Sequence, residues 1–113
     1  MIELECKKVR FYSQQDEEAF FSWAQSIPSV SSVTGLGTSI IVLLKARVVS
    51  DRSLRELVAL FQRYRISMRQ LAQFLTPRNK SWFAAPEMFW FKSVFGAGPT
   101  SRSTRSRVKR APG

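Results

Sequence analysis

Residues 38–46 read TSIIVLLKA, a nearly unbroken run of β-branched and aliphatic side chains. Such a run is typical of a central strand that is covered on both faces of its sheet. Residues 29–37 (SVSSVTGLG) precede it, alternate around Val30 and Val33, and end in a glycine-containing turn. Together the two stretches predict a β-hairpin whose turn lies near residues 35–37.

Upstream of the hairpin, the sequence predicts a first strand within residues 2–13 (IELECKKVRFYS). Ile2, Leu4 and Cys6 alternate with other residues and therefore share one face of this strand. The strand is expected to end near Tyr12.

A first helix is expected between Ser13 and Pro28. Ser13 is a typical N-cap, and Asp16 follows it at the spacing of a capping box. Apolar residues recur at helical spacing after this cap. Pro28 ends the helix because proline cannot continue the backbone hydrogen bonding.

A second helix is expected after the hairpin, with Ser50 or Asp51 as its cap. An apolar stripe at helical spacing supports it, formed by Leu54, Leu57, Val58, Phe61 and Tyr64. Residues 66–75 (ISMRQLAQFL) fit either a strand or a continuation of this helix. We favour a short edge strand, because residues 63–65 interrupt the stripe.

The C-terminal third predicts two helical pieces rich in aromatic residues. Thr76 followed by Pro77 is a typical helix start. Pro86 interrupts this helix, and a second piece is expected over residues 87–95, ending at the glycine that follows. Residues 82–95 hold six of the fourteen aromatic residues of the chain, so we expect this segment to be buried.

The expected order is strand, helix, strand, strand, helix, strand, helix. Its first six elements match the split βαβ arrangement of ferredoxin-like α+β folds (βαββαβ), with the aromatic helical segment added at the C-terminal end. We expect one compact domain over residues 1–97. Residues 98–113 (GPTSRSTRSRVKRAPG) have almost no apolar residues and predict a disordered basic tail.

The chain is strongly basic, with 18 Lys and Arg against 8 Asp and Glu and a net charge of +10. Half of this excess lies in the tail, in Arg102, Arg105, Arg107, Lys109 and Arg110. Such a balance favours contact with polyanions such as nucleic acid. The alternative for the tail is a solvated terminus without function.

Catalytic chemistry has little support in the sequence. The chain contains no histidine, which is the commonest general base near neutral pH and the commonest metal ligand. Its one cysteine, Cys6, lacks a histidine partner for nucleophilic catalysis. We therefore expect no enzymatic activity, no metal and no cofactor.

The sequence also predicts a cytoplasmic location. A single cysteine excludes an intrachain disulfide and fits a reducing compartment. The longest aliphatic run, residues 40–44, is far too short for a membrane span. The N-terminus shows no signal-peptide pattern.

The segment LRELVALFQRYRISMRQLAQFLTP, followed by WF and then MFWFKSVFG, resembles a family of small bacterial proteins with no assigned activity. The resemblance covers residues 10–96 and leaves out the basic tail. It implies a bacterial cytosolic protein and carries no functional residues with it.

Two functions fit these features. The first is a protein–protein interaction module, a small accessory or regulatory protein that contacts a partner or a second copy. The contact would use an open sheet edge or the aromatic segment, with the contact residues Trp82, Phe83, Phe89, Trp90 and Phe91.

The alternative is non-specific nucleic-acid binding through the basic tail and an arginine strip. At helical spacing the strip would consist of Arg52, Arg55, Arg63 and Arg69, and Arg65 is a further candidate contact next to it in the sequence. A solvated helix face without function is the other interpretation of these arginines.

Overall fold

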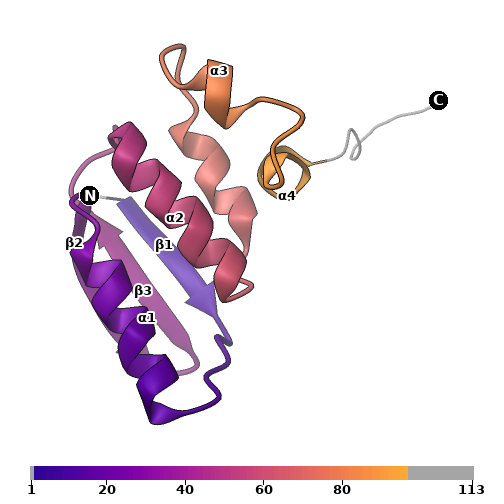
Figure 1. The fold of residues 1–113 in the computed structure, drawn as a ribbon. Coiled ribbons are helices and arrows are strands. Elements are labelled where there is room, and N and C mark those ends of the chain that lie inside the picture. Colours follow the sequence, from indigo (N-terminus) through magenta and orange to yellow (C-terminus); the bar gives the residue numbers. More distant parts are fainter. Residues whose placement is uncertain (1, 97–113) are drawn as a thin grey trace. The chain divides into compact units, whose positions relative to one another are not determined.

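A computed structural model describes residues 2–96 of the chain (Figure 1). The predicted basic tail, residues 98–113, lies outside the described residues. The chain divides after Ser67 into two compact units. One domain over residues 1–97 stays a prediction.

The first unit contains a three-stranded antiparallel sheet and two long helices. In chain order these elements are β1 (Ile2–Lys7), α1 (Gln14–Ser26), β2 (Val30–Leu36), β3 (Ser39–Leu44) and α2 (Asp51–Arg63). The strands lie in the order β1-β3-β2, and β3 pairs antiparallel with both neighbours. The predicted hairpin and the central position of β3 are therefore confirmed.

A two-residue turn formed by Gly37 and Thr38 joins β2 to β3. Gly37 has a φ of 63°, in the left-handed region that glycine adopts without steric cost. Two-residue hairpin loops require such a conformation, which explains the glycine at this position.

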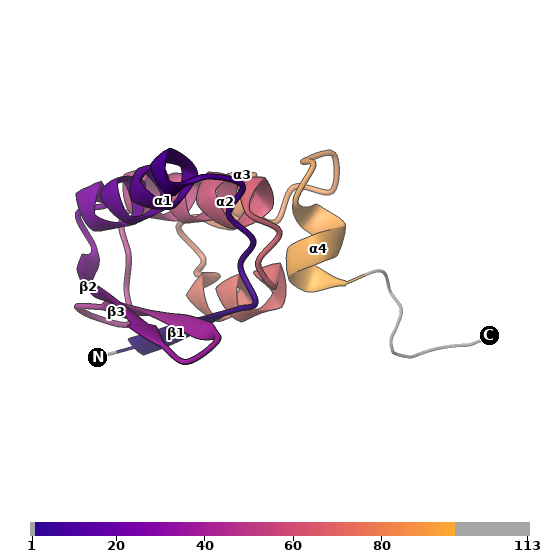
Figure 2. The same ribbon diagram turned by 90° about the horizontal axis from the view of Figure 1, so that it is seen from below.

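The helices cover one face of the sheet. Leu4 and Cys6 on β1 and Val42 on β3 are completely buried, and α1 and α2 both lie across this face (Figure 2). Ile41 and Leu43 alternate with these residues and are only half-buried on the other face. The expectation that β3 would be fully covered on both faces is therefore not met.

β1 is shorter than the sequence suggested. Lys8 has a φ of 52°, and this left-handed conformation turns the chain out of the sheet directly after Lys7. Residues 9–12, expected to continue the strand as far as Tyr12, instead lead to the N-terminus of α1.

Both long helices begin at predicted serine caps. Ser13 Oγ accepts a hydrogen bond from the Asp16 N–H at 3.1 Å, and Ser50 Oγ accepts one from the Ser53 N–H at 3.1 Å. α1 ends before Pro28, as predicted. The boundaries of these helices follow from local capping chemistry.

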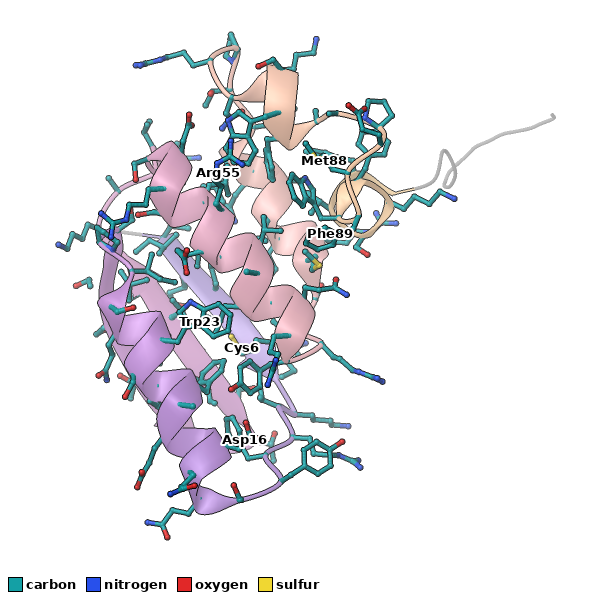
Figure 3. All side chains as sticks on the ribbon, in the orientation of Figure 1. Cys6, Asp16, Trp23, Arg55, Met88 and Phe89 are labelled. Atoms are coloured by element: carbon teal, nitrogen blue, oxygen red, sulfur yellow. The ribbon has the colours of Figure 1, made fainter. Side chains whose placement is uncertain are left out.

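Polar side chains tie α2 to the rest of the first unit. The indole N–H of Trp23 on α1 donates to Glu56 Oε1 on α2 at 2.8 Å; Trp23 is labelled in Figure 3. The buried Ser53 hydroxyl accepts a hydrogen bond from the Ser29 N–H at 3.2 Å, next to the start of β2.

The second unit contains three short helical elements within the described residues. These are the 3₁₀ helix η1 (Met68–Phe74) and the α-helices α3 (Lys80–Phe83) and α4 (Phe91–Phe95). The strand that we favoured over residues 66–75 is therefore wrong.

The spacing of buried residues explains why this segment is helical. Met68, Leu71 and Phe74 are all buried. A strand would place Leu71 on the face opposite Met68 and Phe74. A 3₁₀ helix has three residues per turn, so it places all three side chains on one face.

The two C-terminal helices are shorter than predicted. α3 begins at Lys80 instead of directly after Thr76, and α4 begins at Phe91 instead of at residue 87. The break around Pro86 and the end at Gly96, which has a φ of 83°, agree with the sequence-based expectation.

Aromatic rings pack against one another inside the second unit. The ring centroids of Trp82 lie 5.7 Å from Phe83 and 6.1 Å from Trp90, and Phe83 lies 5.1 Å from Phe95. The indole N–H of Trp90 donates to the Phe83 carbonyl at 2.7 Å. Phe83 and Trp90 are buried, as expected for this segment.

The described residues thus form a small α+β protein with a three-stranded antiparallel sheet and several helices. The ferredoxin-like order is not confirmed, because its sixth element would be a strand where η1 forms a helix.

Asn79 organises the loop between η1 and α3, and its removal should destabilise the protein. Its Oδ1 accepts from the Thr76 N–H at 2.8 Å, its Nδ2 donates to the Phe74 carbonyl at 2.9 Å, and the residue is 3% exposed. Asn79→Ala should lower the free energy of unfolding by about 1–3 kcal/mol, because buried polar groups lose their partners.

Urea unfolding followed by tryptophan fluorescence measures this loss. Arg78→Ala alters an exposed neighbour and is the matched control, expected to stay within about 0.5 kcal/mol of wild type. Equal stability of the Asn79→Ala variant and the control would contradict the assigned role of Asn79.

Cys6 should be chemically inert in the folded protein. Burial, and to a smaller extent the negative charge of Glu5, raises the pKa of its thiol from 9.0 to about 12. Since the thiolate is the reactive form, a thiol reagent at neutral pH should modify Cys6 far more slowly in the native chain than in urea. Similar rates in both conditions would contradict this.

The same pKa shift gives a pH dependence of stability. The folded state holds the proton more tightly than the unfolded state, so this contribution to stability is present below pH 9.0 and is lost as the pH rises towards about 12. The free energy of unfolding should therefore fall across this range.

Candidate functional site

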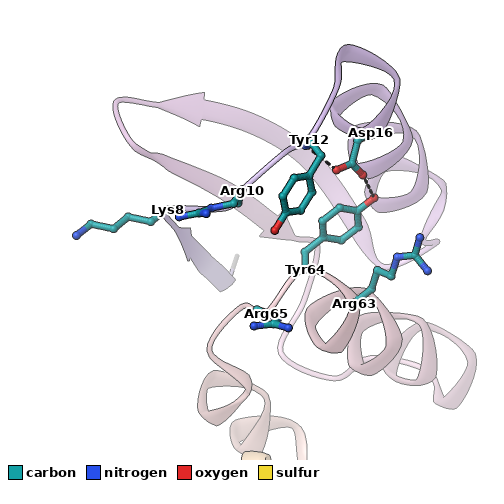
Figure 4. A pocket seen from close by; sticks show the side chains of 7 residues that line it. All are labelled: Lys8, Arg10, Tyr12, Asp16, Arg63, Tyr64 and Arg65. Atoms are coloured by element: carbon teal, nitrogen blue, oxygen red, sulfur yellow. Dashed lines mark hydrogen bonds between the residues drawn. The ribbon is translucent and has the colours of Figure 1, made fainter.

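A pocket opens in the first unit, between the chain that leaves β1 and the end of α2 (Figure 4). Its volume is about 540 Å³. Seven residues line it, and they are Lys8, Arg10, Tyr12, Asp16, Arg63, Tyr64 and Arg65.

Two of the lining residues have an unusual backbone conformation. Lys8 has a φ of 52° and Arg65 a φ of 58°, and within residues 2–96 no other non-glycine residue has a positive φ. This conformation costs roughly 1–2 kcal/mol for a residue with a Cβ atom. Arg65 directly follows the C-cap of α2, where helices commonly end in this conformation, and the Ile66 N–H donates to the Phe61 carbonyl at 2.9 Å to close the helix end. Both left-handed residues lie in the wall of one pocket.

The carboxylate of Asp16 joins the elements around the pocket. Its Oδ2 accepts from the Tyr12 backbone N–H at 3.0 Å, and its Oδ1 accepts from the Tyr64 hydroxyl at 3.2 Å (Figure 4). Asp16 lies in the first turn of α1, so one side chain connects that helix to both pocket walls. The Ser13 side chain accepts from the Asp16 N–H as in a capping box, while the Asp16 carboxylate accepts from the N–H of Tyr12, the residue before the cap.

Three packed rings support the same region. The ring centroids of Phe11 and Phe20 are 5.5 Å apart, and the Tyr64 ring lies 6.0 Å from Phe11 and 5.0 Å from Phe20. Aromatic pairs of this kind contribute about 0.5–1.5 kcal/mol beyond the area that they bury. They anchor Phe11 and Tyr64, and thereby the backbone on either side of the pocket.

The Tyr64 hydroxyl stays protonated well above neutral pH. Partial burial raises its pKa above 10.0, the hydrogen bond to Asp16 and the charge of Asp16 raise it further, and the charge of Arg63 opposes them. Tyr64 therefore remains a hydrogen-bond donor to Asp16 at physiological pH.

Positive charge dominates the pocket lining. The lining contains four cations and a single carboxylate, that of Asp16, which already accepts two hydrogen bonds. Figure 4 shows Lys8 and Arg63 extending away from each other on opposite sides of the two tyrosines. This spread of cations suits an extended chain of negative charges better than one small anion.

Tyr12 offers an exposed ring among these cations. It is 84% exposed, while its backbone N–H is held by Asp16. An exposed ring fixed at its backbone and surrounded by cations has the features of a stacking platform for a planar ligand group.

The structure brings together two of the five predicted contact arginines. Arg63 and Arg65 line the pocket. Arg52 and Arg55 lie near the start of α2, and the rise per residue places Arg52 about 16 Å along the helix axis from Arg63. Arg69 belongs to the second unit, where its guanidinium lies next to Gly96.

The predicted interaction aromatics differ in exposure. Phe89 is 63% exposed, and it precedes α4 together with the half-buried Met88 (Figure 3). Trp82 and Phe91 are half-buried, and Phe83 and Trp90 are buried. The predicted tail cations, Arg102, Arg105, Arg107, Lys109 and Arg110, lie outside the described residues.

Sequence reasoning did not single out Lys8, Arg10, Tyr12 or Tyr64 as site residues. A signal was present, because KKVRFY, which begins at the last residue of β1, and RYR, which begins at the last residue of α2, both combine cations with aromatic residues. Their meeting in space could not be foreseen while β1 was expected to continue through the first of these segments.

Residues 2–96 contain no cluster of three or more His, Cys, Asp or Glu side chains that could hold a metal ion. No helix in this range is long and apolar enough to cross a membrane.

Comparisons with protein-family models, curated proteins and solved structures found no match to this chain. The candidate site is therefore assigned from its own geometry and charge.

The bond between Asp16 and Tyr64 can be tested by titration. A Tyr12→Phe background leaves Tyr64 as the single tyrosine, so the absorbance of tyrosinate reports on that residue alone. Asp16→Asn in this background should lower the pKa of Tyr64, because it removes a negative charge that disfavours the phenolate. An unchanged pKa would contradict the hydrogen bond.

Proposed function

We propose that this protein is a non-enzymatic, sequence-independent binder of single-stranded nucleic acid. The observation that carries the proposal is the pocket in which four cations surround two tyrosines. We propose the bacterial cytoplasm as its setting, on the resemblance of residues 10–96 alone.

Phosphate binding is supported by the number and the spread of the cations. Lys8, Arg10, Arg63 and Arg65 outnumber the single carboxylate of the lining by three charges. A nucleic-acid backbone would reach several of them at once, since successive phosphates are spaced along the strand. Each phosphate that is bound releases counterions, so binding should weaken steeply with salt.

Base stacking on Tyr12 explains why a single strand is the favoured form. The bases of a single strand are accessible to an exposed ring, and those inside a duplex are already stacked. Every base has a π face, so stacking on Tyr12 would select little for sequence.

The protein–protein role that the sequence also predicted remains a proposal. In the aromatic segment, only the exposed Phe89 supports this role well. Phe83 and Trp90 are buried and already contact other residues of the second unit. Stronger support comes from the first unit, in the exposed edge strand β2.

Fluorescence anisotropy of the full chain with a labelled thymidine oligonucleotide of about ten nucleotides tests the nucleic-acid proposal. Arg10→Gln with Arg63→Gln removes two pocket cations and leaves the strained residues Lys8 and Arg65 unchanged. The plot of log affinity against log salt should become shallower by about 1.4, because each phosphate that is no longer neutralised reduces the slope by about 0.7.

Arg52→Gln with Arg55→Gln is the matched control, because it removes the same charge from the far end of α2. This control should keep the affinity and the salt slope close to those of wild type. Equal weakening by both double variants would show diffuse attraction and overturn the pocket as the binding site.

Tyr12→Ala separates stacking from charge. It should weaken thymidine binding by about 1–3 kcal/mol, the range measured for single stacked bases. It should leave binding of an abasic oligonucleotide of equal length unchanged, because that strand keeps its phosphates and lacks bases. Equal losses for both strands would contradict stacking on Tyr12.

A further inference from the structure

The strand β2 presents a free, exposed edge. It pairs with β3 and with no other strand among residues 2–96. Ser31, Ser32, Thr34, Gly35 and Leu36 are all exposed, and Leu36 is 68% exposed. In an antiparallel pair, alternate residues direct their N–H and C=O groups away from the neighbouring strand, so the outer edge of β2 offers unpaired backbone groups.

This edge lacks the usual protection against strand pairing. Edge strands are commonly blocked by charged side chains or proline. β2 has neither, and its bulge between Val30 and Ser32 affects only the first part of the strand. The following residues 32–36 keep regular pairing with β3.

The surroundings of the edge are also uncharged. Residues 19–44 contain no Asp, Glu, Lys or Arg, although the chain as a whole is 23% charged. This range includes β2, β3 and the part of α1 that packs next to β2. Depletion of charge is a feature of the centre of protein interfaces.

We propose that β2 pairs antiparallel with β2 of a second copy of this chain, so that two three-stranded sheets join into one. The proposal is independent of nucleic-acid binding. β3 separates β2 from β1, the strand that leads into the pocket. No residue of β2 is among the residues that line the pocket.

A second copy is the occupant that the composition of the edge favours. In a two-fold dimer, β2 of one copy lies next to β2 of the other. Charged side chains on this strand would therefore lie close to the same charges of the second copy and repel them. β2 is uncharged and escapes this repulsion. β1, the other edge strand, carries Glu3, Glu5 and Lys7 at exposed positions.

Pairing also covers apolar surface. Around a two-fold axis at Thr34, Leu36 would lie opposite Ser32 of the second copy, since antiparallel partners are placed symmetrically about the axis. Thr34 is in register with Ile41 and Leu36 with Ser39, so these side chains share the half-covered face of the sheet. The joined sheet would continue the half-buried Ile41 and Leu43 surface across both copies.

Sedimentation velocity of the full chain, over concentrations from about 1 μM to 1 mM, tests the proposal. Wild type should shift from monomer to dimer as its concentration rises. Thr34→Lys places a charge in the centre of the edge, and like charges would face each other in the dimer. This variant should dissociate at least about tenfold more readily than wild type.

Ser93→Lys is the matched control, because it adds the same charge at an exposed position of α4. It should dimerise like wild type. A wild-type chain that stays monomeric throughout, or a dimer that Thr34→Lys weakens no more than Ser93→Lys does, would overturn the proposal. Circular dichroism of Thr34→Lys must match wild type, so that loss of the dimer is not loss of the fold.

The salt concentration separates this proposal from the proposed nucleic-acid function. Dimerisation through an uncharged edge should persist at high salt, where binding to phosphates is lost. A dimer that dissociates when salt is raised would point to an interface between charged residues and would contradict pairing at β2.

Discussion

The apolar face of a three-stranded sheet must be covered, and in residues 2–67 two helices cover it. Leu4, Cys6 and Val42 have no access to water only because α1 and α2 both lie across this face. Burial of such side chains is the main favourable term in folding, at about 25 cal/mol per Å² of apolar area. The arrangement also brings the chain that leaves β1 close to the end of α2, and the basic residues of the pocket are the ones that lie there.

Asp16 fixes the two walls of the pocket relative to each other by hydrogen bonds. Its two oxygens connect the Tyr12 backbone and the Tyr64 hydroxyl, and the left-handed residues Lys8 and Arg65 turn the chain next to them. These bonds hold the backbone of both pocket walls in place. The four cations, which repel one another, are therefore kept close together. The opposite edge of the sheet is uncharged, so one small unit combines a surface for polyanions with a surface for self-association.

The helix caps and the hairpin could be predicted from sequence because they depend on neighbouring residues. Ser13, Ser50 and Gly37 act within a few residues of their own positions. The 3₁₀ helix η1 was missed because its apolar residues fit two periodicities, and the burial of Leu71 with Met68 and Phe74 decides between them. Of the pocket cations, Arg63 and Arg65 were predicted as contacts, and Lys8 and Arg10 were not. These two pairs come from segments far apart in the sequence, and they meet only because β1 stops at Lys7.

Backbone NMR of the isotopically labelled full chain, titrated with a thymidine oligonucleotide, tests the central claim most directly. If the pocket binds single strands, the largest and earliest shift changes should fall at Lys8, Arg10, Tyr12 and residues 63–65. The amides of β2 should change little, since no residue of this strand lines the pocket. Changes confined to residues outside this pocket, or no changes at low salt, would contradict the assignment of the pocket as the nucleic-acid site.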